Sequence, residues 1–264
     1  MPAGRRPDGL RGKVWLIGPA GPGVDADVAA LTAFFGALPG GWRLPVEPVR
    51  VNGGGCTADA VSAALRDIQG FDGLRIVWVG GHTRPNRFGA PALLTDDVDA
   101  RDRTSLSMVD LWHALAESAA DRPLMALVDV CQAAANPQLQ SPPRHLAAFA
   151  ACRRDQPAKA DTRGGWFTQA LVAGLTAGRR TPAALIEGIE HALARDHQGA
   201  QTPWVHIGAD IAELWLAPDI CPRDGRRLRA GDVLGHRYRL DERIGQGAFS
   251  RVWAAHDLES GASV

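Results

Sequence analysis

Residues 74–83 read LRIVWVGGHT, and residues 124–134 read LMALVDVCQAA. Each stretch opens with a short, mostly apolar run, which is too short for a buried helix and predicts a buried strand. Each run leads to a chemically reactive side chain, His82 in the first stretch and Cys131 in the second. In parallel sheets, functional groups gather beyond the carboxyl ends of the strands. If the two strands are neighbours, His82 and Cys131 therefore emerge at the same edge of one sheet.

Further short apolar runs alternate with segments of helical period along the chain. We expect strands at 13–18, 46–51, 146–150 and 204–207, and helices at 25–38, 57–69, 105–120, 165–177 and 182–194. Thr57 suits the N-cap of the second helix, and Pro182 suits the first turn of the last. Strands that alternate with helices imply right-handed crossovers and helices on both faces of a sheet. The predicted fold class is therefore α/β: a three-layer sandwich around a mostly parallel six-stranded sheet, with 80–104 as a polar loop.

The composition is that of an ordinary globular chain. Of its 264 residues, 45% are hydrophobic and 22% are charged, which excludes disorder throughout. The 29 basic and 29 acidic side chains give zero net charge, which argues against a nucleic-acid partner or a membrane surface. No run approaches the roughly 20 apolar residues of a membrane helix, and no signal peptide opens the chain. The four cysteines form no CxxC pair, so a cytoplasmic location with reduced thiols is expected.

The pairing of His82 with Cys131 has two interpretations. A thiolate is a nucleophile, and a nearby imidazole lowers the pKa of the thiol and carries protons to a leaving amine. Alternatively, Cys131 is a small buried hydrophobic side chain and His82 is a hydrogen-bonded structural residue. The two glycines before His82, and Asp129 two residues before Cys131, favour the catalytic interpretation.

Here the sequence resembles the caspase-like cysteine peptidases, the group that contains caspases and metacaspases. VWVGGHT is similar to their strand ending in a Gly-His pair, and LVDVCQAA is similar to their strand ending in Asp-x-Cys. The 49 residues from His82 to Cys131 agree with the spacing of about 50 in caspases. The stretches 92–115 and 149–175 resemble segments of bacterial members, so the resemblance covers about 13–216. It implies a caspase-like three-layer sandwich.

The resemblance also implies roles for individual residues. Cys131 would attack the scissile carbonyl, and His82 would protonate the leaving amine and later activate water. The backbone N–H groups of Cys131 and Thr83 would form the oxyanion hole, which needs donors fixed in advance. Two positions depart from the family pattern: Thr83 stands where glycine is usual, and 132–134 replace His-Ser-Gly or a basic residue. A donor at Thr83 requires a backbone conformation that suits a β-branched residue.

The resemblance further implies that the substrate is a peptide cut after Arg or Lys. Positions two apart in a strand face the same side, so Asp129 and Cys131 should face one pocket. Metacaspases carry Asp at this point and prefer basic residues, and Asp25 is similar in position to a second pocket Asp of theirs. Arg should exceed Lys, because a guanidinium forms bidentate hydrogen bonds with carboxylates. The alternative is that Asp129 braces a neighbouring loop.

Two loops invite further expectations. Some metacaspases bind calcium through carboxylates after the histidine, where this chain has Asp96, Asp97, Asp99 and Asp102; the alternative is a solvated loop, and no other cofactor is expected. The stretches 132–144 and 152–165 are polar, contain proline and are expected to be mobile. They offer basic residues for slow self-cleavage: Arg144, Arg153, Arg154, Lys159 and Arg163.

The C-terminal residues carry a separate signal. YRLDERIGQGAFSRVWAAHDLESGASV, at 238–264, resembles the start of a Ser/Thr protein kinase, with Gly245, Gly247 and Val252 in its nucleotide-binding positions. The sequence ends before the strand that would supply the phosphate-binding Lys, so we expect no ATP binding, and a poorly ordered two-strand fragment. The predicted organisation is a flexible N-terminus at 1–12, a peptidase domain at 13–217, a linker at 218–234 and a truncated kinase lobe at 235–264.

The residues thus predict a cytosolic cysteine endopeptidase that forms the protease part of a protease–kinase fusion. Its partners would be protein or peptide substrates with a basic residue before the cut, and the kinase domain. The alternative is a catalytically weak caspase-like scaffold that recruits partners to the kinase or regulates it.

Overall fold

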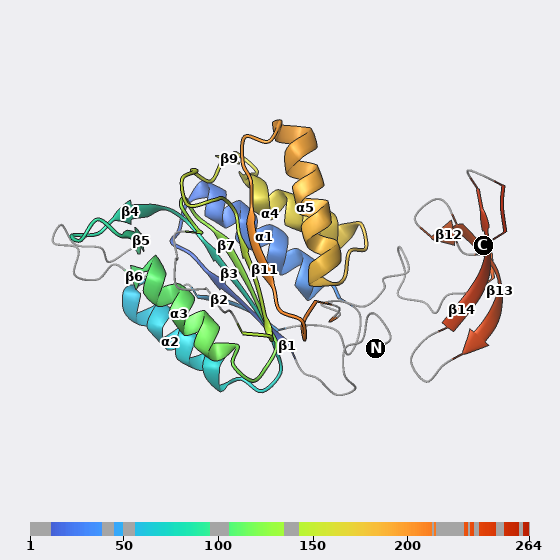
Figure 1. The fold of residues 1–264 in the computed structure, drawn as a ribbon, viewed down its shortest axis with the longest axis horizontal. Helices are drawn as coiled ribbons and strands as arrows, with labels where there is room; N and C mark the ends of the chain where they lie inside the picture. Colours follow the sequence, from blue (N-terminus) through green and yellow to red (C-terminus); the bar gives the residue numbers. More distant parts are fainter. Residues whose placement is uncertain are drawn as a thin grey trace. The chain divides into compact units, whose positions relative to one another are not determined.

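The computed structural model describes residues 12–38, 45–49, 56–95, 106–134, 143–212 and 214, and, nearer the C-terminus, 230–231, 233–234, 238–246, 251–258 and 261–263. The chain divides into two compact units, Met1–Ala217 and Pro218–Val264. Figure 1 shows the sheet and helices of the first unit and the small sheet of the second.

In the described part of the first unit, the central element is a six-stranded sheet with the order β11-β8-β7-β3-β1-β2. Its strands are β1 (Gly12–Ile17), β2 (Val46–Val49), β3 (Leu74–Gly80), β7 (Leu124–Asp129), β8 (Leu146–Ala150) and β11 (Trp204–Ile207). Neighbouring strands are parallel, except that β11 runs antiparallel to β8 at one edge. The prediction of a mostly parallel six-stranded α/β sheet is confirmed.

Helices cover both faces of this sheet. They are α1 (Pro22–Gly36), α2 (Ala58–Gly70), α3 (Met108–Ser118), α4 (Trp166–Thr176) and α5 (Pro182–His197). Figure 1 shows α1, α4 and α5 on one face, with α2 and α3 on the other. The predicted cap is present, because Ala60 N donates to Thr57 Oγ1 over 3.2 Å, and Pro182 opens α5. α1 begins three residues earlier than predicted, since Pro22 suits a first turn.

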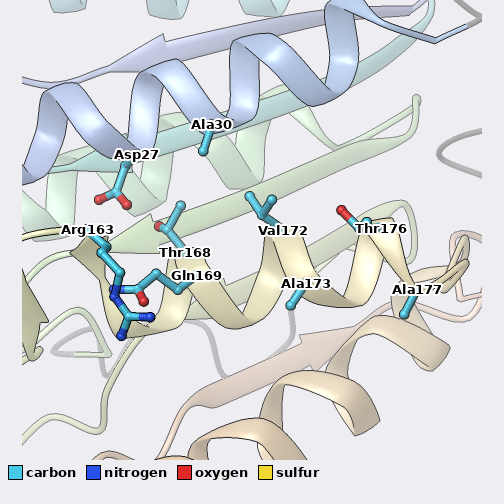
Figure 2. A pocket seen from close by; sticks show the side chains of 9 residues that line it. All are labelled: Asp27, Ala30, Arg163, Thr168, Gln169, Val172, Ala173, Thr176 and Ala177. Atoms are coloured by element: carbon cyan, nitrogen blue, oxygen red, sulfur yellow. The ribbon is translucent and has the colours of Figure 1, made fainter.

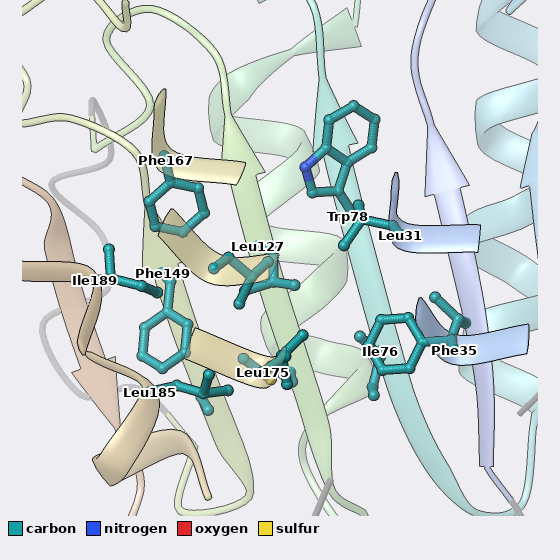
Figure 3. Close-up of a cluster of buried hydrophobic side chains, with 14 of the residues drawn as sticks. Leu31, Phe35, Ile76, Trp78, Leu127, Phe149, Phe167, Leu175, Leu185 and Ile189 are labelled. Atoms are coloured by element: carbon teal, nitrogen blue, oxygen red, sulfur yellow. The ribbon is translucent and has the colours of Figure 1, made fainter. Parts of the chain in front are cut away.

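The sheet separates two hydrophobic clusters, which explains why its strands are apolar on both faces. Every residue of β3 and β7 is buried. On the side of α1, α4 and α5, Trp78 packs among aliphatic and aromatic side chains (Figure 3). The polar edge of its indole is paired, because Trp78 Nε1 donates to Thr168 Oγ1 over 2.9 Å. The hydrophobic interior is therefore closely packed beneath the carboxyl ends of the strands.

Part of the stretch predicted as polar loop, and the first residues of the helix predicted at 105–120, form a small antiparallel sheet instead. Its strands are β4 (Thr83–Pro85), β5 (Pro91–Leu93) and β6 (Leu106–Ser107). The β4–β5 turn is built on Asn86, whose Oδ1 accepts from Phe88 N and Ala90 N. A second short hairpin joins β9 (Ala160–Asp161) to β10 (Gly164–Gly165). Strands of two or three residues are too short for an alternating pattern, so periodicity did not reveal them.

The second unit contains, in its described residues, a three-stranded antiparallel sheet of β12 (Val233–Leu234), β13 (Tyr238–Gln246) and β14 (Arg251–Asp257). The two strands expected within 238–264 are present as β13 and β14, and β12, from the stretch predicted as a linker, adds a third strand, with Leu240 and Ala255 buried. Gly245 lies opposite Val252 in the β13–β14 ladder, whereas Gly247 lies outside the described residues.

Candidate active site

His82 and Cys131 emerge at one edge of the sheet. Strands β3 and β7 are parallel neighbours, and Gly80 lies opposite Asp129 at their carboxyl ends. His82 and Cys131 each follow that pair by two residues. Adjacent strands are about 4.8 Å apart, so the backbone places His82 and Cys131 in neighbouring positions at this edge of the sheet. The imidazole is exposed and Cys131 is half-buried, as a nucleophile open to substrate requires.

Hydrogen bonds fix the turn that carries Cys131. Thr83 Oγ1 donates to the carbonyl oxygen of Cys131 over 3.0 Å. On the other side, Gln132 N donates to the carbonyl oxygen of Gln156 over 3.2 Å. Gln132 has φ 53°, a left-handed conformation that is uncommon for residues other than glycine. The thiol itself faces the carbonyl oxygen of Ala158, with the Sγ–O distance 3.9 Å.

The backbone at Thr83 is compatible with an oxyanion donor. Leu94 N donates to His82 O over 2.8 Å, and Asn86 N donates to Ala90 O over 2.7 Å. In an antiparallel pair, successive residues direct their backbone groups to opposite sides, so Thr83 N–H points away from β5. Thr83 lies in a strand without a positive φ, which suits its β-branched side chain. The departure from glycine therefore leaves the donor available.

The segment 152–165, which contacts the nucleophile, is held by glutamine side chains. Buried Gln201 accepts from Lys159 N through Oε1 over 2.7 Å, and donates to Ala151 O through Nε2 over 2.9 Å. Gln156 Oε1 accepts from Thr202 N over 3.2 Å. The sequence predicts a mobile loop here, but these contacts, formed by residues 40 to 50 positions away, anchor it beside Cys131.

Asp129, the last residue of β7, is buried against the beginning of α4. Its Oδ2 accepts from Thr168 N over 3.1 Å and from Thr168 Oγ1 over 2.7 Å. Burial raises the pKa of Asp129 to about 6, although the hydrogen bonds from Thr168 act in the opposite direction. The carboxylate thus caps the Thr168 N–H and braces the first turn of α4, whereas the alternative weighed from the sequence was the bracing of a neighbouring loop.

Asp27 is a second buried carboxylate, which the sequence analysis missed. Gly165 N donates to both of its oxygens, over 3.1 and 3.0 Å. Burial, together with the charges of Asp129 and Asp161, raises the pKa of Asp27 to about 7, although the hydrogen bonds from Gly165 act in the opposite direction. Asp25, the residue expected to accompany Asp129, is exposed on α1. One signal could have identified Asp27: it lies beside Val28 in the buried stripe of a helix, where a carboxylate is unusual.

Gly164 and Gly165 allow this close approach. A Cβ added to Gly164 would overlap the carboxylate of Asp27, and one added to Gly165 would overlap the carboxylate of Asp129. Gly164 also has φ +115°, which side chains rarely adopt. The β9–β10 hairpin can therefore cover the two carboxylates only because these positions lack side chains.

A groove of about 560 Å³ lies between α1 and α4 (Figure 2). Its walls are mostly small apolar side chains, and Asp27 and Arg163 lie at one end. Arg163 donates to Asp161 over 2.8 Å, which holds the pKa of Asp161 at about 2. Neither His82 nor Cys131 lines the groove, so it is not the site of the predicted chemistry.

Some of the remaining candidates lie outside the part of the chain that the structure describes. Residues 96–105, which hold the acidic run proposed for calcium, lie outside the described residues, and so do Gly247 and the side chain of Val252. Within the described ranges, no group of three or more His, Cys, Asp or Glu side chains could hold a metal ion. None of the described helices is long and apolar enough to cross a membrane.

Comparisons with known proteins agree with this fold. Residues 21–209 match the family described as Caspase domain, Peptidase C14. Caspase-1 of Spodoptera frugiperda is similar in structure, with a TM-score of 0.53 and 17% identity over 79% of this chain and 90% of that one. A protein of Geobacter sulfurreducens has a TM-score of 0.51 and 14% identity over 75% of this chain and 94% of that one. No curated protein matches the sequence.

Proposed function

This chain belongs to the caspase-domain family, and from that premise we propose that it is a cysteine endopeptidase with a Cys131–His82 dyad. One observation carries the proposal: His82 and Cys131 both lie two residues beyond the opposed pair Gly80 and Asp129 on parallel neighbouring strands. A nucleophile and a base within reach of one another are what acyl transfer through a thiol requires.

The chemistry follows from these positions. The thiol proton passes to His82 as Cys131 Sγ bonds to the scissile carbonyl carbon, and the oxygen becomes an oxyanion facing the N–H groups of Cys131 and Thr83. His82 returns the proton to the amine as the C–N bond breaks, leaving a thioester. Water, deprotonated by His82, then attacks the thioester, releases the carboxylic acid and restores the thiol.

A covalent label tests the dyad. A peptidyl chloromethyl ketone should add to Cys131, and intact mass should show one adduct that is absent in Cys131→Ala. His82→Ala should slow labelling and peptide hydrolysis at least about a hundredfold, since a general base typically contributes that much. His113→Ala, which removes an exposed histidine of α3, is the matched control and should behave as wild type. Equal labelling of Cys131→Ala would overturn the proposal.

The proposed specificity is cleavage after Arg, with Lys second, through Asp129 and Asp25. Asp129 stands two residues before Cys131 and is buried against the β9–β10 hairpin, and Asp25 is exposed on α1, where a substrate side chain can reach it. Asp→Asn keeps the acceptors that cap α4 but removes the charge that a guanidinium needs. With matched Arg, Lys and Asp fluorogenic peptides, Asp129→Asn should lower kcat/KM for Arg about tenfold or more while the protein stays folded. Unchanged Arg turnover would leave Asp129 only its bracing role.

One contact favours the alternative, a catalytically weak scaffold. The thiol of Cys131 donates to Ala158 O, and this occupies the nucleophile with a partner inside the chain. A scaffold would resist the chloromethyl ketone under all conditions, including high calcium. For the peptidase we expect no cofactor, so EDTA should leave turnover unchanged. A loss that calcium restores would assign a metal role to the acidic run at 96–102.

The second unit is proposed as the beginning of a Ser/Thr kinase domain, with the peptidase as its fusion partner in the cytoplasm. The hairpin of β13 and β14 and the position of Gly245 opposite Val252 support this reading. We expect no micromolar ATP binding by residues 238–264 alone, because glycine-rich loops need a Lys and metal ligands to hold phosphates. Micromolar binding that depends on Gly245 and Gly247 would contradict this.

A further inference from the structure

The peptide unit between Cys131 and Gln132 is held at both of its ends. Its carbonyl oxygen accepts from Thr83 Oγ1 over 3.0 Å, and its N–H donates to Gln156 O over 3.2 Å. The two partners come from different parts of the chain, since Thr83 follows β3 and Gln156 follows β8. The plane of this peptide is therefore fixed from two sides.

The two hydrogen bonds fix the main chain at the residue that carries the nucleophile. The carbonyl carbon of Cys131 is bonded to the same Cα atom as its side chain, so a displacement of this peptide moves the point from which the thiol side chain starts. Gln132 is in the left-handed region, which is unfavourable for a residue with a side chain. Without a restraint the peptide would tend to leave this conformation. The hydroxyl of Thr83 supplies one of the two restraints, which glycine at this position could not.

We propose that Thr83 is a positioning residue for the Cys131 thiol, through the hydrogen bond from its hydroxyl to the Cys131 carbonyl. Because Thr83 directly follows His82, the same bond couples the backbone carrying the imidazole to the turn carrying the thiol. This inference rests on the proposed peptidase function. It assigns Thr83 a side-chain role in addition to the backbone role implied by the family.

Thr83→Val and Thr83→Ser separate the hydroxyl from the shape of the side chain. Thr83→Val should lower kcat about tenfold and leave KM within twofold, because a small misplacement of a reacting group slows chemistry without weakening binding. Thr83→Ser keeps the hydroxyl and should recover at least half of the wild-type kcat. Thr57→Val is the matched control: it also removes a hydrogen-bonded hydroxyl, at the N-cap of α2, and should lower Tm without changing kcat.

Two readouts do not depend on turnover. Hydrogen exchange at the Gln132 amide should be about tenfold faster in Thr83→Val than in wild type or Thr83→Ser, because the released peptide no longer holds its N–H on Gln156 O. The second readout is the rate at which iodoacetamide alkylates Cys131, followed by peptide mass across pH 6–9. This rate should differ from wild type in Thr83→Val and return to the wild-type rate in Thr83→Ser.

These results distinguish a failure of the proposed peptidase function from a failure of the positioning role. A wild type that hydrolyses no peptide, but whose Gln132 exchange and Cys131 alkylation respond to Thr83→Val as described, would refute the peptidase and retain the positioning role. Wild-type kcat in Thr83→Val, or Gln132 exchange and Cys131 alkylation equal to wild type, would overturn the positioning role itself. Equal losses in Thr83→Val and Thr83→Ser would also overturn it, because the hydroxyl would then not be the active element.

Discussion

At the residue scale, the carboxyl of Asp27 carries an energetic cost that depends on pH. Burial and the charges of Asp129 and Asp161 raise its pKa to about 7 in the folded chain, from 3.8. Between these values the folded protein binds more protons than the unfolded one. The stability contributed by Asp27 is therefore complete below about pH 4 and is lost as the pH rises through about 7.

Asp27→Asn should remove part of this pH dependence. Asn keeps an acceptor for Gly165 N but carries no charge, so the variant should be more stable than wild type at pH 8 and similar at pH 4.5. A pKa difference of this size corresponds to about 1–4 kcal/mol in the free energy of unfolding, or several degrees in Tm. Thermal unfolding at both pH values measures it. Asp25→Asn, an exposed carboxyl of the same helix, is the control, and parallel curves for Asp27→Asn and wild type would contradict the prediction.

Residues that follow strands could be found from the sequence, whereas residues that depend on tertiary contacts could not. His82 and Cys131 stand directly after apolar runs, so their positions at the sheet edge follow from local pattern and parallel topology. Asp27 acquires its role from Gly165, and Thr83 from the carbonyl of Cys131, 138 and 48 residues away. Such partners depend on packing, which a single sequence does not reveal.

At the scale of elements, the β9–β10 hairpin packs closely against α1 and β7 because Gly164 and Gly165 have no side chains. Gly165→Ala should destabilise the first unit by about 2–4 kcal/mol, because the new Cβ overlaps the buried, hydrogen-bonded carboxylate of Asp129. Chemical denaturation measures the loss. Gly36→Ala, at a helix position where a Cβ meets nothing within 4 Å, is the control and should be neutral or slightly stabilising.

A double-mutant cycle identifies the cause. In an Asp129→Ala background the Cβ at position 165 has room, so Gly165→Ala should cost at least 1 kcal/mol less there than in wild type. Equal costs in both backgrounds would show that the carboxylate is not the obstacle.

Long elements were predictable and short ones were not. The strands of the main sheet and all of its covering helices follow from periodicity, within a few residues at their ends. The short strands β4, β5, β6, β9 and β10 hold two or three residues each, so their pairing, and not their pattern, defines them. These short strands position Thr83 and cover the two carboxylates, so the local pattern did not indicate the surroundings of His82 and Cys131.

At the scale of the whole molecule, the first unit contains a hydrophobic core formed by its own residues. Its two clusters on either side of the sheet are formed by residues between 14 and 214. A fragment ending at Ala217 should therefore fold by itself. Its Tm should match, within about 2 °C, one transition of the full chain, and its kcat/KM should be unchanged. Calorimetry and peptide hydrolysis test this, and a fragment that aggregates or unfolds at room temperature would contradict it.

The contact between Gly165 and Asp129 also bears on how this chain can evolve. A larger residue at 165, or a longer acid at 129, lowers the stability of the protein if it is the first substitution to occur. The order of substitutions therefore matters more than their number. A lineage that loses the buried acid can accept alanine at 165, and that alanine then blocks the return of the acid. Such descendants can regain the carboxylate only after glycine has returned at 165.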